Sequence, residues 1–188
     1  MASPPSLPAV LCLCGSLRQQ SSNLSLLRAM IELAPPGLAA RIARPLDRLP
    51  HFNPDIDVEP GPDAVREFRE EVASAPALII SSPEYAFGVP GVLKNALDWL
   101  VSSGELYDKP TALITASPNY GGAARAQAHL LDTLRAQQAR LVEAACVSVA
   151  AVRTRFDAAG RLVDADTVRA LRDGWAALEG AARAEPPG

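Results

Sequence analysis

The feature of this chain that most constrains its fold is a set of short apolar runs that are continuous. A strand with one face in water alternates apolar and polar residues, whereas a strand covered on both faces is apolar along its length. The four continuous runs are AVLCLC (9–14), ALIISS (77–82), TALITAS (111–117) and AACVSVA (144–150). A less regular run over residues 40–46 is a fifth candidate strand. These runs indicate a parallel sheet with helices on both faces.

Segments with helical periodicity separate these runs. The alternation of strand and helix predicts an α/β doubly wound sandwich, in which right-handed crossovers cover both faces of the sheet. Because the chain shows no repeat and no linker, residues 1–188 are expected to form a single domain with loose tails at 1–7 and 183–188. The predicted apolar stripes are Leu24, Leu27, Met30 and Ile31; Val65, Phe68 and Val72; Leu93, Ala96, Leu97, Leu100 and Val101; Leu130, Leu131 and Leu134; and Val168, Leu171, Trp175 and Leu178.

Charge and composition argue against several classes of function. The net charge is −3, whereas nucleic-acid-binding domains usually carry a basic face. No apolar run approaches the roughly 20 residues that span a bilayer, so neither a nucleic acid nor a membrane is expected as a partner. The three cysteines, Cys12, Cys14 and Cys146, lie in apolar runs, which is typical of reduced core thiols in a cytoplasmic protein. No metal site is expected from them.

The first strand is followed by the polar loop GSLRQQSSN (15–23). Ligands of doubly wound folds bind beyond the carboxyl ends of the strands, and free N–H groups at a helix start favour anions. The side chains that add donors there are Ser16, Arg18, Ser21, Ser22 and Asn23. The loop matches neither a Walker A sequence nor G-x-G-x-x-G, and it predicts a site for a phosphate monoester. The alternative is ordinary helix capping by Ser22 or Asn23, which accounts for one of these residues rather than five.

A second alternative concerns Cys12 and Arg18, which stand in the Cys-x5-Arg spacing of tyrosine phosphatases. A nucleophilic thiol needs an electropositive and partly exposed site. Here Cys12 falls inside the predicted strand, and Gln19 stands where those enzymes carry Ser or Thr. The phosphatase interpretation is therefore the less favoured one.

The second unusual loop lies in SPEYAFGVPGVLKNALDWL (82–100), where Tyr85 and Phe87 supply flat apolar surface. Together with GSLRQQSSN, this segment resembles the NADPH-dependent FMN reductase family, which includes quinone, chromate and azo-dye reductases. The matching motifs are G-S-x-R-x-x-S-x-N after the first strand and P-E-Y-x-x-x-x-P-G-x-L-K-N-A-x-D-W after the third. One departure is Ala86, where many members have Asn.

The resemblance implies a flavodoxin-like fold with a five-stranded parallel sheet in the order 2-1-3-4-5. It also implies a cofactor site for FMN, with NADPH or NADH as co-substrate. By resemblance, the FMN phosphate lies on Ser16, Arg18, Ser21, Ser22 and Asn23. The isoalloxazine ring is bordered by Pro83, Glu84, Tyr85, Ala86 and Phe87, and the third side is closed by Ser117, Gly121 and Gly122.

The activity implied is an NAD(P)H oxidoreductase that passes a hydride from nicotinamide to flavin N5. The electrons then go to a small acceptor such as a quinone, free flavin, azo compound or metal oxyanion. No catalytic side chain is predicted, because the chemistry belongs to the cofactor. The two histidines, His51 and His129, are interpreted as structural or surface residues. The alternative is a flavodoxin-type electron carrier, although such carriers are more strongly acidic than this chain.

Trp99 leads to a prediction about assembly. It lies about 100° or more from the centre of the apolar stripe of a helix expected over residues 90–102. A large aromatic side chain on a second helix face often marks a partner surface. Members of the resembled family also commonly form dimers or tetramers, so a homodimer or homotetramer is expected. The alternative is that Trp99 packs under a loop of its own chain.

Overall fold

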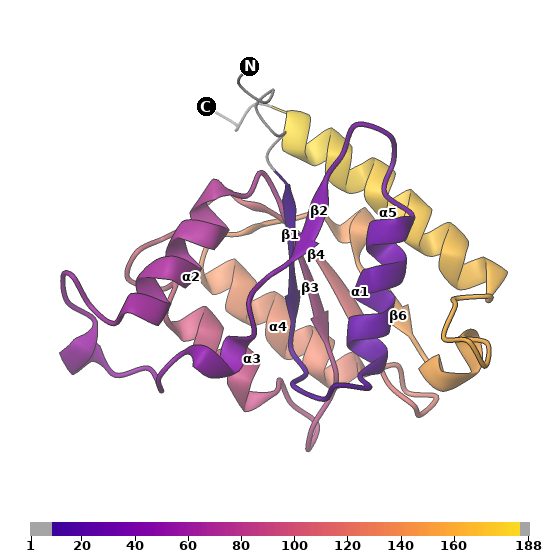
Figure 1. Ribbon diagram of the computed structural model, residues 1–188, viewed down its shortest axis with the longest axis horizontal. Helices are drawn as coiled ribbons and strands as arrows, with labels where there is room; N and C mark the ends of the chain where they lie inside the picture. Colours follow the sequence, from indigo (N-terminus) through magenta and orange to yellow (C-terminus); the bar gives the residue numbers. More distant parts are fainter. Residues whose placement is uncertain (1–8, 185–188) are drawn as a thin grey trace.

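The sheet of this protein is parallel and has the strand order β2-β1-β3-β4-β5, with β6 also paired to β4 (Figure 1). The computed structural model describes residues 9–184, so the predicted tail at 1–7 and the last residues, 185–188, lie outside the described part. The strands are β1 (Val10–Cys14), β2 (Ala40–Ile42), β3 (Leu78–Ser82), β4 (Pro110–Ala116), β5 (Arg140–Leu141) and β6 (Val147–Val149). The predicted flavodoxin-like order 2-1-3-4-5 is thus confirmed.

The last position in the sheet is shared by two short strands. β5 pairs with Pro110 and Thr111 at the start of β4, while β6 pairs with the end of β4. A single 3-10 turn, Glu143–Ala145, separates them. The single strand predicted over 144–150 is therefore wrong in its first half. The interrupted segment packs against the last helix, where Gly174 lies on the backbone of Ala145.

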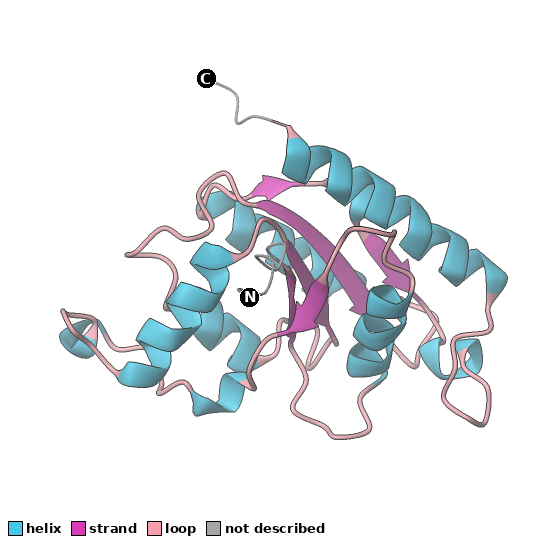
Figure 2. Ribbon diagram, turned by 45° about the horizontal axis from the view of Figure 1, so that its top comes forward, coloured by secondary structure: helices cyan, strands magenta, loops and turns pink. Residues whose placement is uncertain are grey.

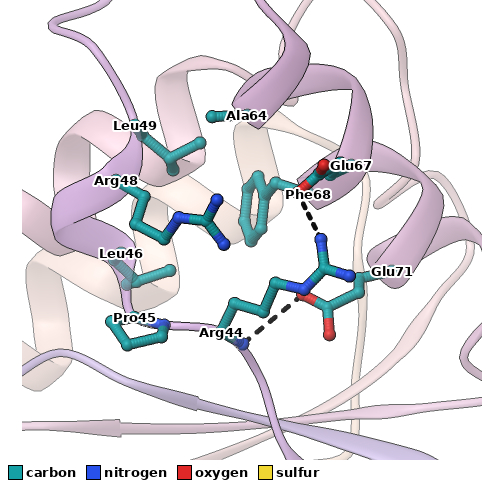
Figure 3. Close-up of a pocket in the computed structure, with 9 residues that line it drawn as sticks. All are labelled: Arg44, Pro45, Leu46, Arg48, Leu49, Ala64, Glu67, Phe68 and Glu71. Carbon is teal, nitrogen blue, oxygen red and sulfur yellow. Dashed lines mark hydrogen bonds and ion pairs between the residues drawn. The ribbon is translucent and has the colours of Figure 1, made fainter.

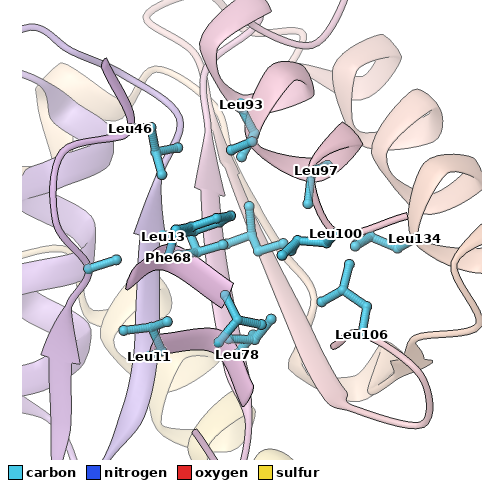
Figure 4. Close-up of a cluster of buried hydrophobic side chains, with 14 of the residues drawn as sticks. Leu11, Leu13, Leu46, Phe68, Leu78, Leu93, Leu97, Leu100, Leu106 and Leu134 are labelled. Carbon is cyan, nitrogen blue, oxygen red and sulfur yellow. The ribbon is translucent and has the colours of Figure 1, made fainter. Parts of the chain in front are cut away.

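Within residues 9–184, five α-helices cover the two faces of the sheet (Figure 2). One core contains side chains of α2, α3 and α4 packed on Leu11, Leu13 and Leu78 (Figure 4). The other core contains side chains of α1 and α5, including Leu27 and Trp175. The helices are α1 (Ser22–Glu32), α2 (Asp63–Ser74), α3 (Gly91–Asp98), α4 (Ala124–Ala136) and α5 (Ala165–Arg183). None of those within residues 9–184 is long and apolar enough to cross a membrane.

The predicted stripes are buried except at five positions. Leu24 and Ile31 of α1, Leu131 of α4 and Val168 of α5 are only half-buried, and in α1 Leu26 is buried beside the predicted Leu27. Val101 is 58% exposed, since α3 ends at Asp98 and the chain turns before reaching it. The helix predicted over 90–102 is therefore shorter than expected.

Trp99 is the clearest correction to the sequence-based expectations. Its side chain is fully buried within its own chain, beneath the loop over residues 49–57. The indole Nε1 donates a hydrogen bond to the Pro50 carbonyl at 2.9 Å, and the ring of Phe52 meets the indole edge to face at 5.1 Å between centroids. Asn95 accepts from the Phe52 amide and donates to the Pro50 carbonyl. The prediction that Trp99 marks a partner surface is wrong, whereas the oligomeric state stays a prediction.

A second set of contacts anchors the end of the same loop. The Arg69 guanidinium donates to the carboxylate of Asp57 at 2.8 Å and to the backbone carbonyl of Trp99. The Ser102 hydroxyl donates to the other carboxylate oxygen of Asp57 at 2.6 Å. The loop between β2 and α2 is therefore tied to both α2 and the end of α3.

This anchor makes part of the stability depend on pH. The hydrogen bonds from Ser102 and Arg69 lower the pKa of Asp57 below its ordinary value of 3.8. A carboxyl group of this kind stabilises the fold above the unfolded value, and the contribution is lost as the pH falls through the lower, folded value. We expect Asp57→Asn to reduce the free energy of unfolding by about 1 kcal/mol at neutral pH, the upper range for an ion pair near solvent. Below pH 3.8 the difference between variant and wild type should shrink.

Urea unfolding of both proteins at neutral pH and at a series of acidic pH values measures this difference. Other carboxylates titrate in both proteins alike, so they cancel in the comparison. A difference that stays constant across the series would mean that Asp57 acts as an acceptor of two hydrogen bonds and not through its charge.

Candidate functional site

Four loops meet at the carboxyl edge of the sheet and line one open cavity. They follow β1, β3, β4 and β6. The cavity brings together nine of the predicted site residues, namely Ser16, Arg18, Ser21, Ser22, Asn23, Pro83, Glu84, Tyr85 and Ser117. Ala86, Phe87, Gly121 and Gly122 are outside its lining, and their contact with a ligand stays a prediction.

The first loop leaves β1 through Gly15, whose amide donates to the Ser81 carbonyl at 2.8 Å. A Cβ at this position would come within 2.9 Å of Leu93 Cδ2 and 3.2 Å of the Ser81 oxygen. Glycine is required there, because the loop passes so close to β3 and α3. This path brings the chain to the start of α1 at the edge of the cavity.

The start of α1 is open to a ligand. Its capping position is Ser21, and among the described residues no side chain caps the helix. The alternative of ordinary capping by Ser22 or Asn23 is therefore wrong. The first amides of a helix lack partners within it and carry partial positive charge. These amides are free to bind an anion in the cavity.

The polar side chains around this helix start are unusually buried. Ser16 is 8% exposed, while Ser21 and Asn23 are each 4% exposed. The Asn23 Oδ1 accepts a hydrogen bond from the Ser81 hydroxyl at 3.0 Å, which ties α1 to β3 and leaves the Asn23 Nδ2 as a donor. With the guanidinium of Arg18, the loop offers donors from four kinds of group. This donor set fits a phosphate monoester, which presents only acceptor oxygens and negative charge.

Cys12 takes no part in this site. Its side chain is fully buried in β1, and burial raises the pKa of its thiol to about 12. The thiolate that a phosphatase needs would be neither formed nor accessible at neutral pH. The phosphatase interpretation is therefore wrong. All three cysteines are free, but the prediction of core thiols holds only for Cys12, since Cys14 and Cys146 are half-buried.

The second loop forms a tight hairpin after β3. The amides and carbonyls of Tyr85 and Gly88 bond to each other at 3.1 and 2.9 Å. Between them Ala86 and Phe87 have φ values of 48° and 63°, the left-handed pair of a type I′ turn. Tyr85 faces the cavity and is 51% exposed, whereas Phe87 at the tip is 63% exposed. The Arg125 guanidinium lies 4.3 Å from the centre of the Phe87 ring.

Ala86 is a poor residue for its backbone conformation. Asparagine tolerates left-handed φ values and is favoured in type I′ turns, whereas alanine is not. We expect Ala86→Asn to raise the free energy of unfolding by about 0.5–1 kcal/mol. Thermal unfolding measures the gain. As a matched control, Ala176→Asn in the exposed part of α5 should lower stability, since asparagine is a weaker helix former than alanine. A loss of stability in both variants would contradict this explanation.

Glu84 has a role in the fold besides the ring contact that its place in the motif predicts. Its Oε2 accepts hydrogen bonds from the amides of Arg125 and Ala126, both at 3.0 Å. These amides lie at the start of α4, whose capping residue Ala123 has a φ of 62° and supplies no side-chain cap. Glu84 lines the cavity, but its charge is used to cap a helix 41 residues further along the chain.

The third loop, which follows β4, is anchored at Gly122. Its carbonyl accepts hydrogen bonds from the hydroxyls of Thr115 at 3.2 Å and Ser148 at 2.7 Å. At its φ of 61° an added Cβ would lie 2.5 Å from the Ser148 oxygen. Gly122 therefore fixes the path of the loop against Ser148 without lining the cavity, whereas Ser117 of the same loop lines it.

Sequence reasoning missed five residues of the lining, namely Ala116, Pro118, Asn119, Val152 and Arg153. The last two follow β6, and a loop after that strand is expected at the same edge of the sheet. The strand predicted over 144–150 could therefore have indicated that the residues after it, including the charged Arg153, lie at the cavity.

A second hollow lies between residues 44–49 and α2 (Figure 3). Its two carboxylates are paired, because the side chain of Arg44 binds Glu67 and the backbone amide of Arg44 donates to Glu71. The apolar wall is made by Leu46, Leu49 and Phe68. With its carboxylates already paired, this hollow offers less to a ligand than the cavity at the sheet edge.

Comparison with known proteins agrees with the geometry. The model of the family described as NADPH-dependent FMN reductase matches residues 8–154. An NAD(P)H-dependent FMN reductase of Pseudomonas aeruginosa is 39% identical over 164 residues, which is 86% of this chain and 88% of that protein. An NADPH:quinone oxidoreductase of Arabidopsis thaliana is 35% identical over 87% of this chain and 86% of its own length.

Solved structures give the same result. The flavoenzyme FerB of Paracoccus denitrificans, an NAD(P)H:(acceptor) oxidoreductase, superposes with a TM-score of 0.83 at 27% identity. The match covers 93% of this chain and 97% of that one. The resemblance read from the two motifs is confirmed.

Proposed function

Because this chain belongs to the NADPH-dependent FMN reductase family, we propose that its cavity holds FMN with the phosphate against the start of α1. Its activity is that of an NAD(P)H-dependent FMN or quinone reductase, as in relatives that are 35–39% identical. Membership in this family favours an enzyme over a flavodoxin-type electron carrier.

The observation that carries the proposal is the donor set of the first loop. Uncapped helix amides and nearly buried hydroxyls of Ser16 and Ser21 face one cavity. The one carboxylate among the described lining residues belongs to Glu84, and it is occupied by the amides of α4. A site with donors and no competing negative charge suits the phosphate of FMN.

FMN supplies the redox chemistry when bound, since its ring takes up a hydride equivalent and releases it to an acceptor. The protein orients the ring and limits access to it. Pro83 and Tyr85 border the cavity beside the first loop, and the hairpin that follows is fixed to α4 through Glu84. His51 and His129 are outside the lining, so we assign no side chain as a general acid or base.

The proposed second substrates are NAD(P)H and a small acceptor such as a quinone. We also propose that the protein is a homodimer or homotetramer. Exposed apolar side chains on three loops around the cavity support self-association, with exposed fractions of 52% for Leu17, 51% for Tyr85 and 92% for Tyr120. Sedimentation across a dilution series tests this, and a protein that stays monomeric at every concentration would contradict it.

The function is tested by titrating the purified protein with FMN and following flavin fluorescence. Saturable binding is expected, with riboflavin bound more weakly because it lacks the phosphate. The loaded protein should then oxidise NADPH or NADH when a quinone is present, with the parallel initial-rate plots of a ping-pong reaction. Failure to bind FMN even in excess would overturn the proposed site.

A further inference from the structure

A turn after β6 brings a second arginine to the cavity. Val152–Arg155 form a short 3-10 turn, and both Val152 and Arg153 line the same cavity as Ser16 and Arg18. This turn comes from the opposite end of the chain to the first loop. The cavity therefore has guanidinium groups from two separate segments.

The turn is held firmly on the third loop. The Ala151 amide donates to the Asn119 carbonyl at 3.1 Å, and the Val152 amide donates to the Ser117 carbonyl at 3.0 Å. The Val152 side chain is 1% exposed and belongs to the core shared by α1 and α5. Because these bonds fix the two residues before Arg153, the backbone of Arg153 has a defined position at the cavity.

The charge of Arg153 is not used within the protein. Its neighbour Arg155 donates to the Asp164 carboxylate at 2.9 Å and to the Ala150 carbonyl at 3.3 Å. By contrast, no ion pair or hydrogen bond joins the Arg153 guanidinium to any residue within 9–184. Among the lining residues of that range, the single carboxylate, that of Glu84, accepts two amides of α4. Arg18 and Arg153 thus leave the cavity with a positive charge.

We propose that Arg153 is a second binding residue for the phosphate monoester held at the start of α1. The inference rests on the proposed function, and the phosphate is that of FMN. A phosphate monoester carries a charge of about −1.5 to −2 at neutral pH, which one guanidinium does not balance. Arg18 approaches from the loop after β1, and Arg153 approaches from the turn after β6. Two forked donors on separate segments can bind different oxygens of one phosphate.

We expect Arg153→Ala to raise the dissociation constant for FMN about 3- to 20-fold, as fits a charged hydrogen bond open to solvent. Riboflavin binding should change little, and Arg153→Lys should recover part of the loss. Flavin fluorescence titrations at low and high salt measure both ligands. Arg169→Ala is the matched control, since it removes a charge from an exposed residue of α5 that pairs with Asp166 outside the cavity. Its FMN affinity should equal that of the wild type.

The outcomes separate this inference from the proposed function. A wild type that does not bind FMN would overturn both. A wild type that binds FMN normally, with Arg153→Ala weakening FMN and riboflavin equally, would overturn the inference alone. An unchanged FMN affinity together with a raised KM for NADPH but not for NADH would also overturn it, because the arginine would then bind the co-substrate. Thermal unfolding of Arg153→Ala should match the wild type, as expected for an exposed side chain without a partner in the described chain.

Discussion

Replacing Arg18 with alanine is expected to raise the dissociation constant for FMN by about 10- to 150-fold, the range for losing a charged hydrogen bond of 1.5–3 kcal/mol. Arg18 lines the cavity next to the uncapped start of α1, and its own backbone amide donates to the Ser16 hydroxyl. Arg18 therefore belongs to the same loop as the hydroxyls of Ser16 and Ser21, which line the cavity with it. The loss should be larger than for Arg153→Ala, because Arg18 belongs to that loop.

Riboflavin provides the control within the same experiment. It has the same ring and ribityl chain as FMN but no phosphate, so Arg18→Ala should affect its binding far less. Arg18→Lys should keep part of the affinity for FMN, since lysine retains the charge but lacks the planar fork. If Arg18→Ala weakened both ligands to the same extent, Arg18 would support the loop and not the phosphate.

Replacing Trp99 with alanine is expected to lower the free energy of unfolding by about 3–5 kcal/mol, the usual cost of removing a fully buried tryptophan. The indole fills the space beneath the loop over residues 49–57, and its N–H satisfies the Pro50 carbonyl. Truncation would leave a cavity and a carbonyl without its donor. Trp99→Phe should cost less, because phenylalanine keeps most of the apolar volume and loses only the hydrogen bond.

Urea unfolding followed by circular dichroism measures both variants without relying on tryptophan fluorescence. Val101→Ala is the matched control, since Val101 was predicted on the same helix but is 58% exposed, and it should change stability little. A Trp99→Ala protein with normal stability but altered self-association would instead support the surface position that the sequence had indicated.

Much of the fold was predictable because the apolar runs report on burial directly. A strand with both faces covered is apolar throughout, so β1, β3 and β4 were found within one residue of their bounds. The last strand was misjudged in its first half, which forms a 3-10 turn that packs against Gly174, a residue distant in sequence. Local composition carries no signal for that contact.

The site was predictable where one loop carries both backbone and side-chain donors, as between Ser16 and Asn23. It was not predictable where the role of a residue depends on a distant partner. Trp99 looked like a surface residue on a helical wheel, but the loop from Pro50 to Asp57 covers it. Arg153 was missed because a single arginine after a strand is an ordinary feature until the fold places it in the same cavity as Arg18.

The hydrogen bonds that the Glu84 carboxylate accepts from α4 have a consequence for redesigning this enzyme. They join the hairpin after β3 to the helix after β4, although the two are 41 residues apart in the chain. A chimera whose hairpin lacks a carboxylate at the position of Glu84 would leave the two α4 amides without their acceptor. Substrate range should therefore be altered by exchanging both segments as one cassette, whereas the phosphate loop can be left in place.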